Sequence, residues 1–221
     1  MGVNALSNEE MYNIAHVHVR YWERDFGGMT NNPKDPGGPT RNGVSLAYLK
    51  DLDIDVADLN KDGKVDIEDI KLVDFDTAKR LFRRTFWEQG KAELAPPLTS
   101  IVYYDFSVTS GSGRATIELQ KAIDELCTGT INGYTANFGP KTQAACKMLN
   151  DQGRDFELAN KFQTKRQEFY TSLATGKSSV YGTFIAGWTA RVNACRALIN
   201  EIHVSGITAA TEENIRRGYG F

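Results

Sequence analysis

The chain has 221 residues, enough for one large domain or two small ones with a hydrophobic core that needs no disulfide or metal to hold it. Hydrophobic residues make up 41% and charged residues 24%, a globular composition that argues against disorder. The 26 basic and 28 acidic side chains give a formal net charge of -2. This near balance argues against a protein that binds nucleic acid through broad electrostatic attraction.

The sequence shows neither a secretion signal nor a membrane span. Residues 1–26 lack a basic stretch followed by an apolar one, and no run of about 18 apolar residues occurs anywhere. We therefore expect a chain that is made and kept in a cytoplasm. The three cysteines, Cys127, Cys146 and Cys195, are far apart and include no CxxC pair, so we expect buried or free thiols rather than disulfides or a zinc site.

The first part of the chain combines helical patterns with a long turn-rich segment. Ser7 and Glu10 form a capping box, and apolar residues then recur at helical spacing, which predicts a helix over about 8–24. The segment 27–45 is rich in glycine and proline, so we expect a tightly turned loop or a small hairpin there. The pattern then predicts a helix, a polar loop and a second helix, at about 44–52, 58–69 and 74–89.

Pro96 and Pro97 mark the expected domain boundary, which gives two parts, 1–97 and 98–221. The second part is helical in pattern, apart from a loop at 128–139 that is rich in glycine, asparagine and threonine. Its amphipathic or helical segments are expected at 98–106, 113–126, 140–149, 155–174 and 180–202. The predicted fold class is therefore mainly α with a small loop or hairpin, and we expect both parts to pack into one globule.

A twelve-residue segment, Asp58–Asp69, has the residue pattern of an EF-hand calcium loop. Oxygen-bearing side chains occupy positions 1, 3, 5, 9 and 12, glycine occupies position 6, and position 7 needs to offer only its backbone carbonyl. Calcium takes about six to eight oxygen ligands, so this pattern supplies the donors that the ion prefers. The predicted metal ligands are Asp58, Asn60, Asp62, Lys64, Asp66 and Asp69.

Position 12 departs from the usual pattern, because Asp69 replaces the glutamate that normally binds calcium through both oxygens. The shorter side chain could weaken the affinity or favour magnesium, although calcium loops of the dockerin type use the same aspartate. The loop occurs once, whereas EF-hand sensors normally pair their loops, so we expect a structural calcium rather than a calcium switch. The alternative is a solvated acidic turn that binds no ion.

The segment Glu23–Ser45 contains the residue types that a glycoside hydrolase needs. Glu23 lies at the expected end of the first helix, and Asp35 and Thr40 lie in the turn-rich segment that follows. In such an enzyme one acid protonates the leaving oxygen, while a second carboxylate and a hydroxyl place water or stabilise the developing cation. Acidic residues beside glycine are also common in ordinary turns, so spacing alone leaves both interpretations open.

The sequence GGMTNNPKDPGGPTRNGVS over 27–45 resembles the motif EGGxxNDPxDPGGxTxxGxT of the glycoside hydrolase family 108 N-acetylmuramidases, many of which are phage endolysins or related bacterial proteins. The resemblance implies a lysozyme-like, mainly helical fold and cleavage of the β-1,4 bond between N-acetylmuramic acid and N-acetylglucosamine. It suggests Asp35 as the second carboxylate and Thr40 as a hydroxyl that orients water. An endolysin would stay in the host cytoplasm before release to the periplasm or cell wall.

Residues 99–191 resemble the peptidoglycan-binding region that follows in that family. The matching positions are Asp105, Gly111, Gln120, the sequence GPKT at 139–142, Arg166, Phe169, Tyr170, Gly187, Trp188 and Arg191. From this resemblance we expect Gln120, Trp188 and Arg191 to contact the substrate. The expected partner is bacterial peptidoglycan, with no nucleic acid and no membrane span, and a monomer is the favoured state.

The family's catalytic glutamate is the first residue of EGG, and in an ungapped register that position is Phe26, which cannot donate a proton. Glu23 lies one helical turn earlier, and residues at i and i+3 share a helix face, so Glu23 can point to the same side. We therefore expect Glu23 to be the general acid, with Asp25 as the alternative. A third reading is a catalytically inactive wall-binding protein on the same frame.

Two further alternatives stay open. A lytic transglycosylase would use the same acid but leave anhydro-muramic ends, because no water would be positioned for attack. A calcium-responsive interaction module would expose apolar surface when calcium is added. His16, His18 and His203 are too scattered in the sequence to indicate a triad or a metal site.

Overall fold

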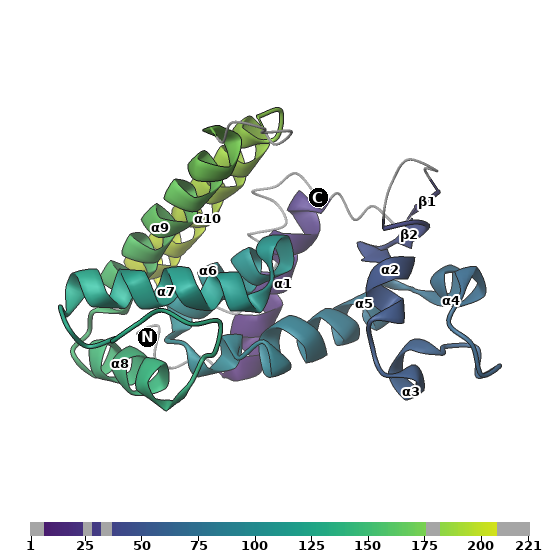
Figure 1. Cartoon of the computed structure of the whole chain (residues 1–221), viewed down its shortest axis with the longest axis horizontal. Helices are drawn as coiled ribbons and strands as arrows, with labels where there is room; N and C mark the ends of the chain where they lie inside the picture. Colours follow the sequence, from purple (N-terminus) through teal and green to yellow (C-terminus); the bar gives the residue numbers. More distant parts are fainter. Residues whose placement is uncertain (1–6, 24–27, 32–36, 176–181, 207–221) are drawn as a thin grey trace. The chain divides into compact units, whose positions relative to one another are not determined.

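The computed structural model is mainly helical, with a small three-stranded antiparallel sheet (Figure 1). This arrangement confirms the predicted fold class. The residues that the structure describes are 7–23, 28–31, 37–175 and 182–206. The chain divides into two compact units, which we name the small unit (residues 20–83) and the helical unit (residues 1–19 and 84–221).

The small unit contains the sheet and several short helices. Its strands have the order β1-β2-β3, and Thr40 in the central strand pairs with Thr30 on one side and with Ser45 on the other. The elements of this unit are β1 (Met29–Thr30), β2 (Thr40–Arg41), β3 (Val44–Ser45), α2 (Leu46–Lys50), α3 (Ile54–Ala57), α4 (Ile67–Leu72) and α5 (Phe75–Phe82).

The helical unit is built around α6 (Pro97–Ser110). Every residue from Leu98 to Ser107 is buried, because the helix contacts α7, α9 and α10 on its different sides. A helix that is buried on all sides is mostly apolar, and most residues of this stretch are apolar or aromatic, although Asp105 is a buried charge that needs partners. The other elements of the unit are α1 (Asn8–Trp22), η2 (Arg83–Gln89), η3 (Ala92–Leu94), α7 (Ser112–Leu126), α8 (Pro140–Asp151), α9 (Asp155–Thr175) and α10 (Ile185–Ser205).

An aromatic cluster ties α1 to the helical unit. The ring of Tyr12 lies edge-on to Trp87 and to Tyr104, with centroids 5.5 Å and 5.6 Å away. The Trp87 indole also donates a hydrogen bond of 2.8 Å to Asn8. The first helix therefore belongs to the same core as the C-terminal half, although the sequence suggested that it belonged with residues up to 97.

The division of the chain thus differs from the predicted one. The structure places the boundaries at 19/20 and 83/84, whereas the sequence indicated a boundary at Pro96-Pro97. The two prolines mark the start of α6 instead, where proline suits the first helical position because its missing N–H is not needed there.

The helix predictions otherwise agree well with the structure. The capping box of α1 is present, since Ser7 Oγ accepts a hydrogen bond from Glu10 N and Glu10 Oε2 accepts one from Ser7 N. The helix expected over 74–89 begins after its N-cap Asp74 and changes to π-helical geometry at Arg83. No helix of the described residues is long and apolar enough to cross a membrane. All three cysteines are free, as expected.

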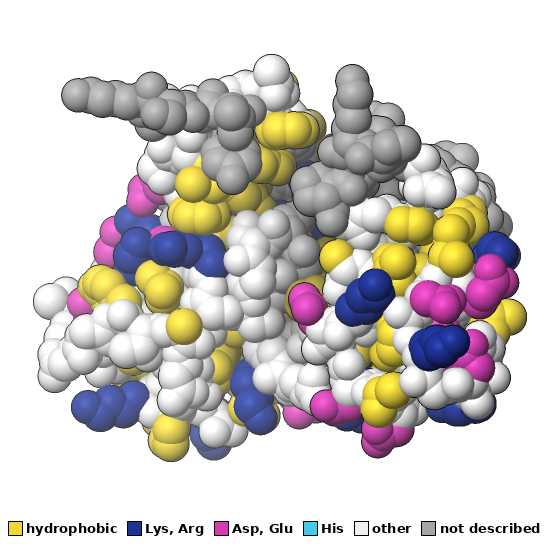
Figure 2. Space-filling model, turned by 45° about the vertical axis from the view of Figure 1, so that its right-hand side comes forward, with side chains coloured by type: hydrophobic (Ala, Val, Ile, Leu, Met, Phe, Trp, Pro, Cys, Tyr) yellow, Lys and Arg dark blue, Asp and Glu magenta, His cyan; other side chains and the backbone are white. Residues whose placement is uncertain are grey.

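The face shown in Figure 2 carries basic and acidic side chains close to one another. Apolar side chains lie between these charges, and the described residues in view form no broad area of a single charge. This mixture is what the formal net charge of -2 leads one to expect.

Candidate active site

Glu23 directly follows the last residue of α1 and has an exposed side chain. It lies against the turn between β2 and β3, because a β-carbon placed on Gly43 would be 3.9 Å from the Glu23 Cβ. The same β-carbon would be 3.4 Å from the ring of Phe82. The glutamate therefore combines access to solvent with a neighbouring hairpin and an aromatic ring in the same unit.

The hairpin beside Glu23 is set by a two-residue turn. Asn42 and Gly43 have φ values of 51° and 74°, and positive φ at both central positions is the requirement of a type I′ turn. The buried Asn42 side chain donates a hydrogen bond of 2.8 Å to the carbonyl of Val73. Arg41 also donates to the carbonyl of Lys71. These bonds connect the turn to the C-terminal end of α4 and to Val73, the residue that follows the helix.

Thr40 lies on the central strand of the sheet and is half-buried. Its hydroxyl donates a hydrogen bond of 3.1 Å to the carbonyl of Gly38, which leaves the oxygen as an acceptor. The other predicted catalytic residue, Asp35, lies outside the described residues, as do the alternative acid Asp25 and the aromatic residue Phe26. The structure thus places two of the predicted residues, Glu23 and Thr40, at the same small sheet.

The loop Asp58–Asp69 folds around its two buried carboxylates. Asp58 accepts hydrogen bonds from Asp62 N and Gly63 N, at 3.2 Å and 2.9 Å. Asp69 is fully buried and accepts from the backbone N–H groups of Leu59, Asn60 and Asp66. Gly63 has a φ of 84°, a conformation that glycine adopts without strain.

The oxygen atoms of this loop are ligands that a hard cation prefers, but in the structure the carboxylates of Asp58 and Asp69 accept hydrogen bonds from backbone N–H groups. In the described part of the chain, no three carboxylates of the loop lie within 4.8 Å of one another. Asp69 also caps the next helix, since it is the third residue of α4 and its Oδ2 accepts from the N–H of the N-cap residue Asp66. An ion that binds Asp69 would therefore compete with these backbone hydrogen bonds.

A buried charge cluster in the helical unit connects three residues that carry the family resemblance. Asp105 accepts a hydrogen bond of 2.7 Å from Arg191 Nε and another, of 2.5 Å, from Arg166 Nη1. All three side chains are buried. Burial alone would raise the pKa of Asp105, but the two guanidinium groups outweigh this effect and hold the pKa well below its ordinary value.

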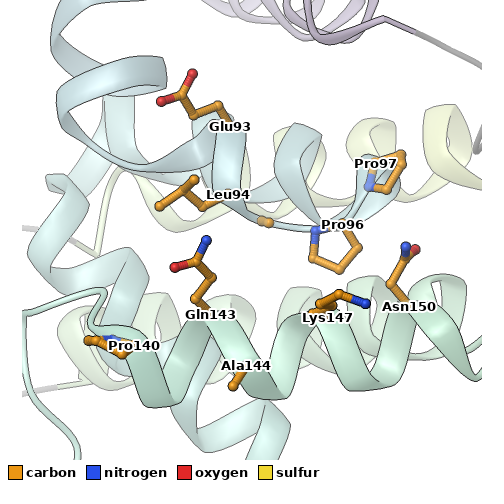
Figure 3. A pocket seen from close by; sticks show the side chains of 10 residues that line it. Glu93, Leu94, Pro96, Pro97, Pro140, Gln143, Ala144, Lys147 and Asn150 are labelled. Carbon is orange, nitrogen blue, oxygen red and sulfur yellow. The ribbon is translucent and has the colours of Figure 1, made fainter.

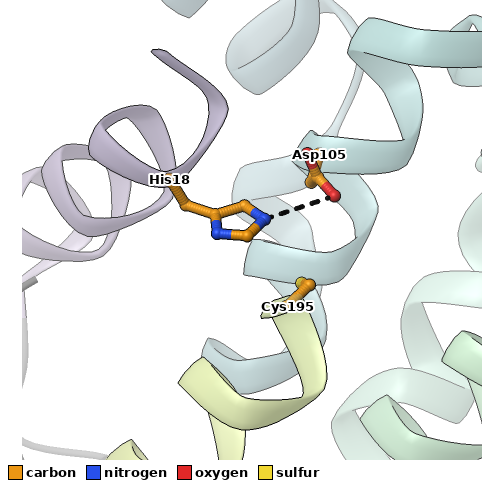
Figure 4. Close-up of side chains that lie close together, drawn as sticks. All are labelled: His18, Asp105 and Cys195. Atoms are coloured by element: carbon orange, nitrogen blue, oxygen red, sulfur yellow. Dashed lines mark ion pairs between the residues drawn. The ribbon is translucent and has the colours of Figure 1, made fainter. Parts of the chain in front are cut away.

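His18 and Cys195 complete this cluster, and ligand atoms of these two residues and Asp105 lie within 4.8 Å of one another (Figure 4). The sequence did not indicate this proximity. Three observations argue against a metal or nucleophile site. Both oxygens of Asp105 already bind arginine, the neighbouring guanidinium groups repel cations, and burial raises the pKa of the Cys195 thiol to about 12.

The predicted substrate-binding residues occupy different environments. Gln120 is buried and donates to Thr142 Oγ1 and the Asn137 carbonyl, at 3.0 Å and 3.2 Å. Arg191 is buried in the cluster around Asp105. Trp188 is half-buried and stacks on the ring of Tyr170, with centroids 4.9 Å apart. Gln120 and Arg191 thus hold the helical unit together, and a contact of these residues with substrate stays a prediction.

Part of the chain also matches the model of a known protein family. Residues 18–111 match the family model Glycosyl hydrolase 108. This glycosyl hydrolase 108 segment contains Glu23, Thr40 and the loop at 58–69. It ends at Gly111, so the predicted peptidoglycan-binding role of the residues beyond it stays a prediction.

The fold is also similar to a solved structure, titled "Structure of Brucella abortus SagA". The two share 24% sequence identity and a TM-score of 0.64, and the match covers 91% of this chain and 99% of that chain. At this identity the likeness shows the fold. No curated protein matches the chain.

Proposed function

We propose that the chain is a peptidoglycan hydrolase that cleaves the β-1,4 bond between N-acetylmuramic acid and N-acetylglucosamine. The observation that carries the proposal is the exposed Glu23, which follows α1 and lies against the Asn42-Gly43 hairpin within the glycosyl hydrolase 108 segment. A carboxylic acid in such a position is open to a polysaccharide, and its Cβ lies beside the hairpin. An accessible proton donor is what glycoside hydrolysis requires.

In the proposed reaction Glu23 donates its proton to the glycosidic oxygen as the bond to the sugar breaks. The sugar then carries positive charge in an oxocarbenium-like transition state, and a water molecule attacks the anomeric carbon as it gives one proton to a carboxylate. Thr40 contributes a hydroxyl oxygen that accepts a hydrogen bond from this water. Asp35 is the proposed second carboxylate. The products are a reducing muramic acid end and a new hydroxyl on the leaving sugar.

Digestion of purified peptidoglycan tests this proposal, with soluble fragments identified by mass spectrometry. We expect the wild type to release reducing muramic ends and Glu23→Gln to lose about 10²- to 10⁴-fold in rate, the usual contribution of a general acid. Glu201→Gln is a matched control, because Glu201 is an exposed glutamate of α10 in the helical unit. Its activity should equal that of the wild type.

The other outcomes select among the alternatives. Release of reducing ends by Glu23→Gln at the wild-type rate would assign the acid to Asp25 or another carboxylate. Anhydro-muramic ends would indicate a lytic transglycosylase. If neither protein releases fragments while both sediment with the wall, the chain is a noncatalytic binder, in keeping with Phe26 at the position of the family's glutamate.

We further propose that the loop at 58–69 binds a structural Ca²⁺ through Asp58, Asn60, Asp62, Asp66, Asp69 and the Lys64 carbonyl. The support comes from the oxygen donors at loop positions 1, 3, 5, 9 and 12 and from the glycine turn at Gly63. The ion would hold the segment between α3 and α4 in one conformation. The peptidoglycan-binding role of residues 98–221 and an endolysin life cycle belong to the same proposal and await their own tests.

A further inference from the structure

A groove of about 510 Å³ lies within the helical unit, between the segment Glu93–Pro97 and helix α8 (Figure 3). Sites for small ligands usually measure about 300–1,000 Å³ and combine apolar walls with a few polar groups. This groove has that size and that composition. It contains none of the residues proposed for catalysis or calcium binding, so it is a separate site of the chain.

One wall of the groove is mostly apolar. Leu94, Ala95, Pro96 and Pro97 form it together with Glu93, and the two prolines have no N–H to offer a ligand. Figure 3 shows the carboxylate of Glu93 turned away from α8. The carbonyls of the two prolines already accept hydrogen bonds from the backbone and side chain of Ser100, at 2.7 Å each. This wall therefore offers a ligand mainly nonpolar contact.

The opposite wall presents polar groups from one face of α8. Gln143, Lys147 and Asn150 have the spacing i, i+4 and i+7, which places them along the same side of the helix. Figure 3 shows the amide group of Gln143 pointing toward Leu94 and that of Asn150 toward the two prolines. Within the part of the chain that the structure describes, neither side-chain amide has a hydrogen-bond partner.

Lys147 adds a positive charge to this row of amides. Its ammonium group contacts Asp151 Oδ2 at 2.5 Å, and the two side chains are 73% and 57% exposed. An exposed pair of this kind contributes at most about 1 kcal/mol. A carboxylate of a ligand in the groove can therefore replace Asp151 at little cost.

We infer that the groove binds the stem peptide of peptidoglycan, the short peptide that carries free carboxylates and small alanine methyl groups. Each side-chain amide both donates and accepts, as a peptide group does, so Gln143 and Asn150 match an extended peptide. Lys147 matches its carboxylate, and Ala144 and the prolines match its methyl groups. A bare glycan fits less well, because no aromatic residue lines the groove to pack against a sugar ring.

This inference rests on the proposed function, and binding of the free peptide tests it apart from hydrolysis. The probe is the tetrapeptide L-Ala–D-Glu–diaminopimelate–D-Ala, titrated into the full chain by calorimetry. We expect saturable binding that Lys147→Glu weakens about tenfold, since a hydrogen bond to a charged group is worth about 1.5–3 kcal/mol and tenfold corresponds to 1.4 kcal/mol. Gln143→Ala should weaken binding as well.

Lys161→Glu is the matched control, because Lys161 is a lysine of the same unit that also pairs with an acidic residue, Glu125, and does not line the groove. It should bind the peptide like the wild type, and the unfolding temperatures of all variants should agree. Absence of saturable binding, or equal affinity in the wild type and Lys147→Glu, would overturn the inference. So would Lys147-dependent binding of a peptide-free glycan oligomer instead of the peptide. Cleavage of peptidoglycan without peptide binding would refute this site and leave the muramidase proposal standing.

Discussion

Arg191 donates a hydrogen bond of 2.7 Å from Nε to Asp105 Oδ1, across 86 positions of the sequence. Both side chains are buried, and Arg166 occupies the second oxygen of the same carboxylate. Asp105 lies on α6, Arg166 on α9 and Arg191 on α10, so the carboxylate of Asp105 connects two long helices to the central helix. Charges buried in this way are stable only while every partner is present.

Asp105→Asn should therefore destabilise the protein strongly. The substitution keeps the shape of the side chain but leaves two buried guanidinium groups beside a neutral amide. Removing one partner of a buried ion pair typically costs about 3–5 kcal/mol. Denaturant unfolding measures the loss, with Asp151→Asn as the control. Asp151 forms an exposed pair with Lys147, so its substitution should change the free energy of unfolding by at most about 1 kcal/mol. Equal effects of both variants would contradict this account.

The stability of the protein should also fall as the pH decreases below about 6.5. Burial lowers the pKa of His18 from its ordinary value of 6.5, and the nearby Arg166 and Arg191 lower it further, against the opposing effect of Asp105. Below pH 6.5 the unfolded chain therefore binds a proton at His18 more readily than the folded chain does. Stability is complete above pH 6.5 and declines below it, by up to about 1.4 kcal/mol per pH unit for one proton.

Unfolding free energies between pH 5 and pH 8 test this effect. His18→Gln should flatten the decline, because glutamine does not titrate in this range. A decline of the same size in His18→Gln would assign the effect to other groups.

Local sequence signals predicted the elements of this fold better than its assembly. The Ser7–Glu10 capping box and the glycine-rich segment each act over a few residues, and the structure contains the helix and the small sheet expected from them. The pairing of Asp105 with Arg166 spans 61 positions, and no local pattern encodes such a contact. For the same reason the sequence missed that α1 packs on Trp87 and Tyr104, and so misplaced the domain boundary.

The candidate active site shows the same limit. The helical pattern placed Glu23 at the end of the first helix, where the structure has it. The position of Glu23 against Gly43 depends on the conformation of the hairpin formed by β2 and β3. The spacing of residues in the sequence does not specify this conformation. The groove along α8 was also missed, because its two walls lie more than forty positions apart and neither carries a recognisable motif.

Removing calcium should lower the unfolding temperature. An ion that binds only the folded chain adds stability by mass action, about 2.7 kcal/mol when its concentration is 100 times the dissociation constant. We expect a lower midpoint in chelator than in calcium, measured by differential scanning calorimetry. Asp62→Ala removes a loop oxygen at position 5 and should reduce the difference between the two conditions. Identical melting curves of the wild type in chelator and in calcium would contradict calcium binding by this loop.

Gly43→Ala should reduce both stability and hydrolysis. Gly43 has a φ of 74°, and a methyl group there would stand 3.4 Å from the Phe82 ring and 3.9 Å from the Glu23 Cβ. A left-handed backbone costs an L-residue about 1–2 kcal/mol, and relief of this strain would shift the hairpin against which Glu23 lies. Gly133→Ala is the control, because Gly133 lies in the helical unit, has a φ of 82°, and a β-carbon there meets no atom within 4 Å. We expect Gly43→Ala to lower kcat on purified peptidoglycan and Gly133→Ala to leave it unchanged. A fully active Gly43→Ala would show that the hairpin turn does not position the acid.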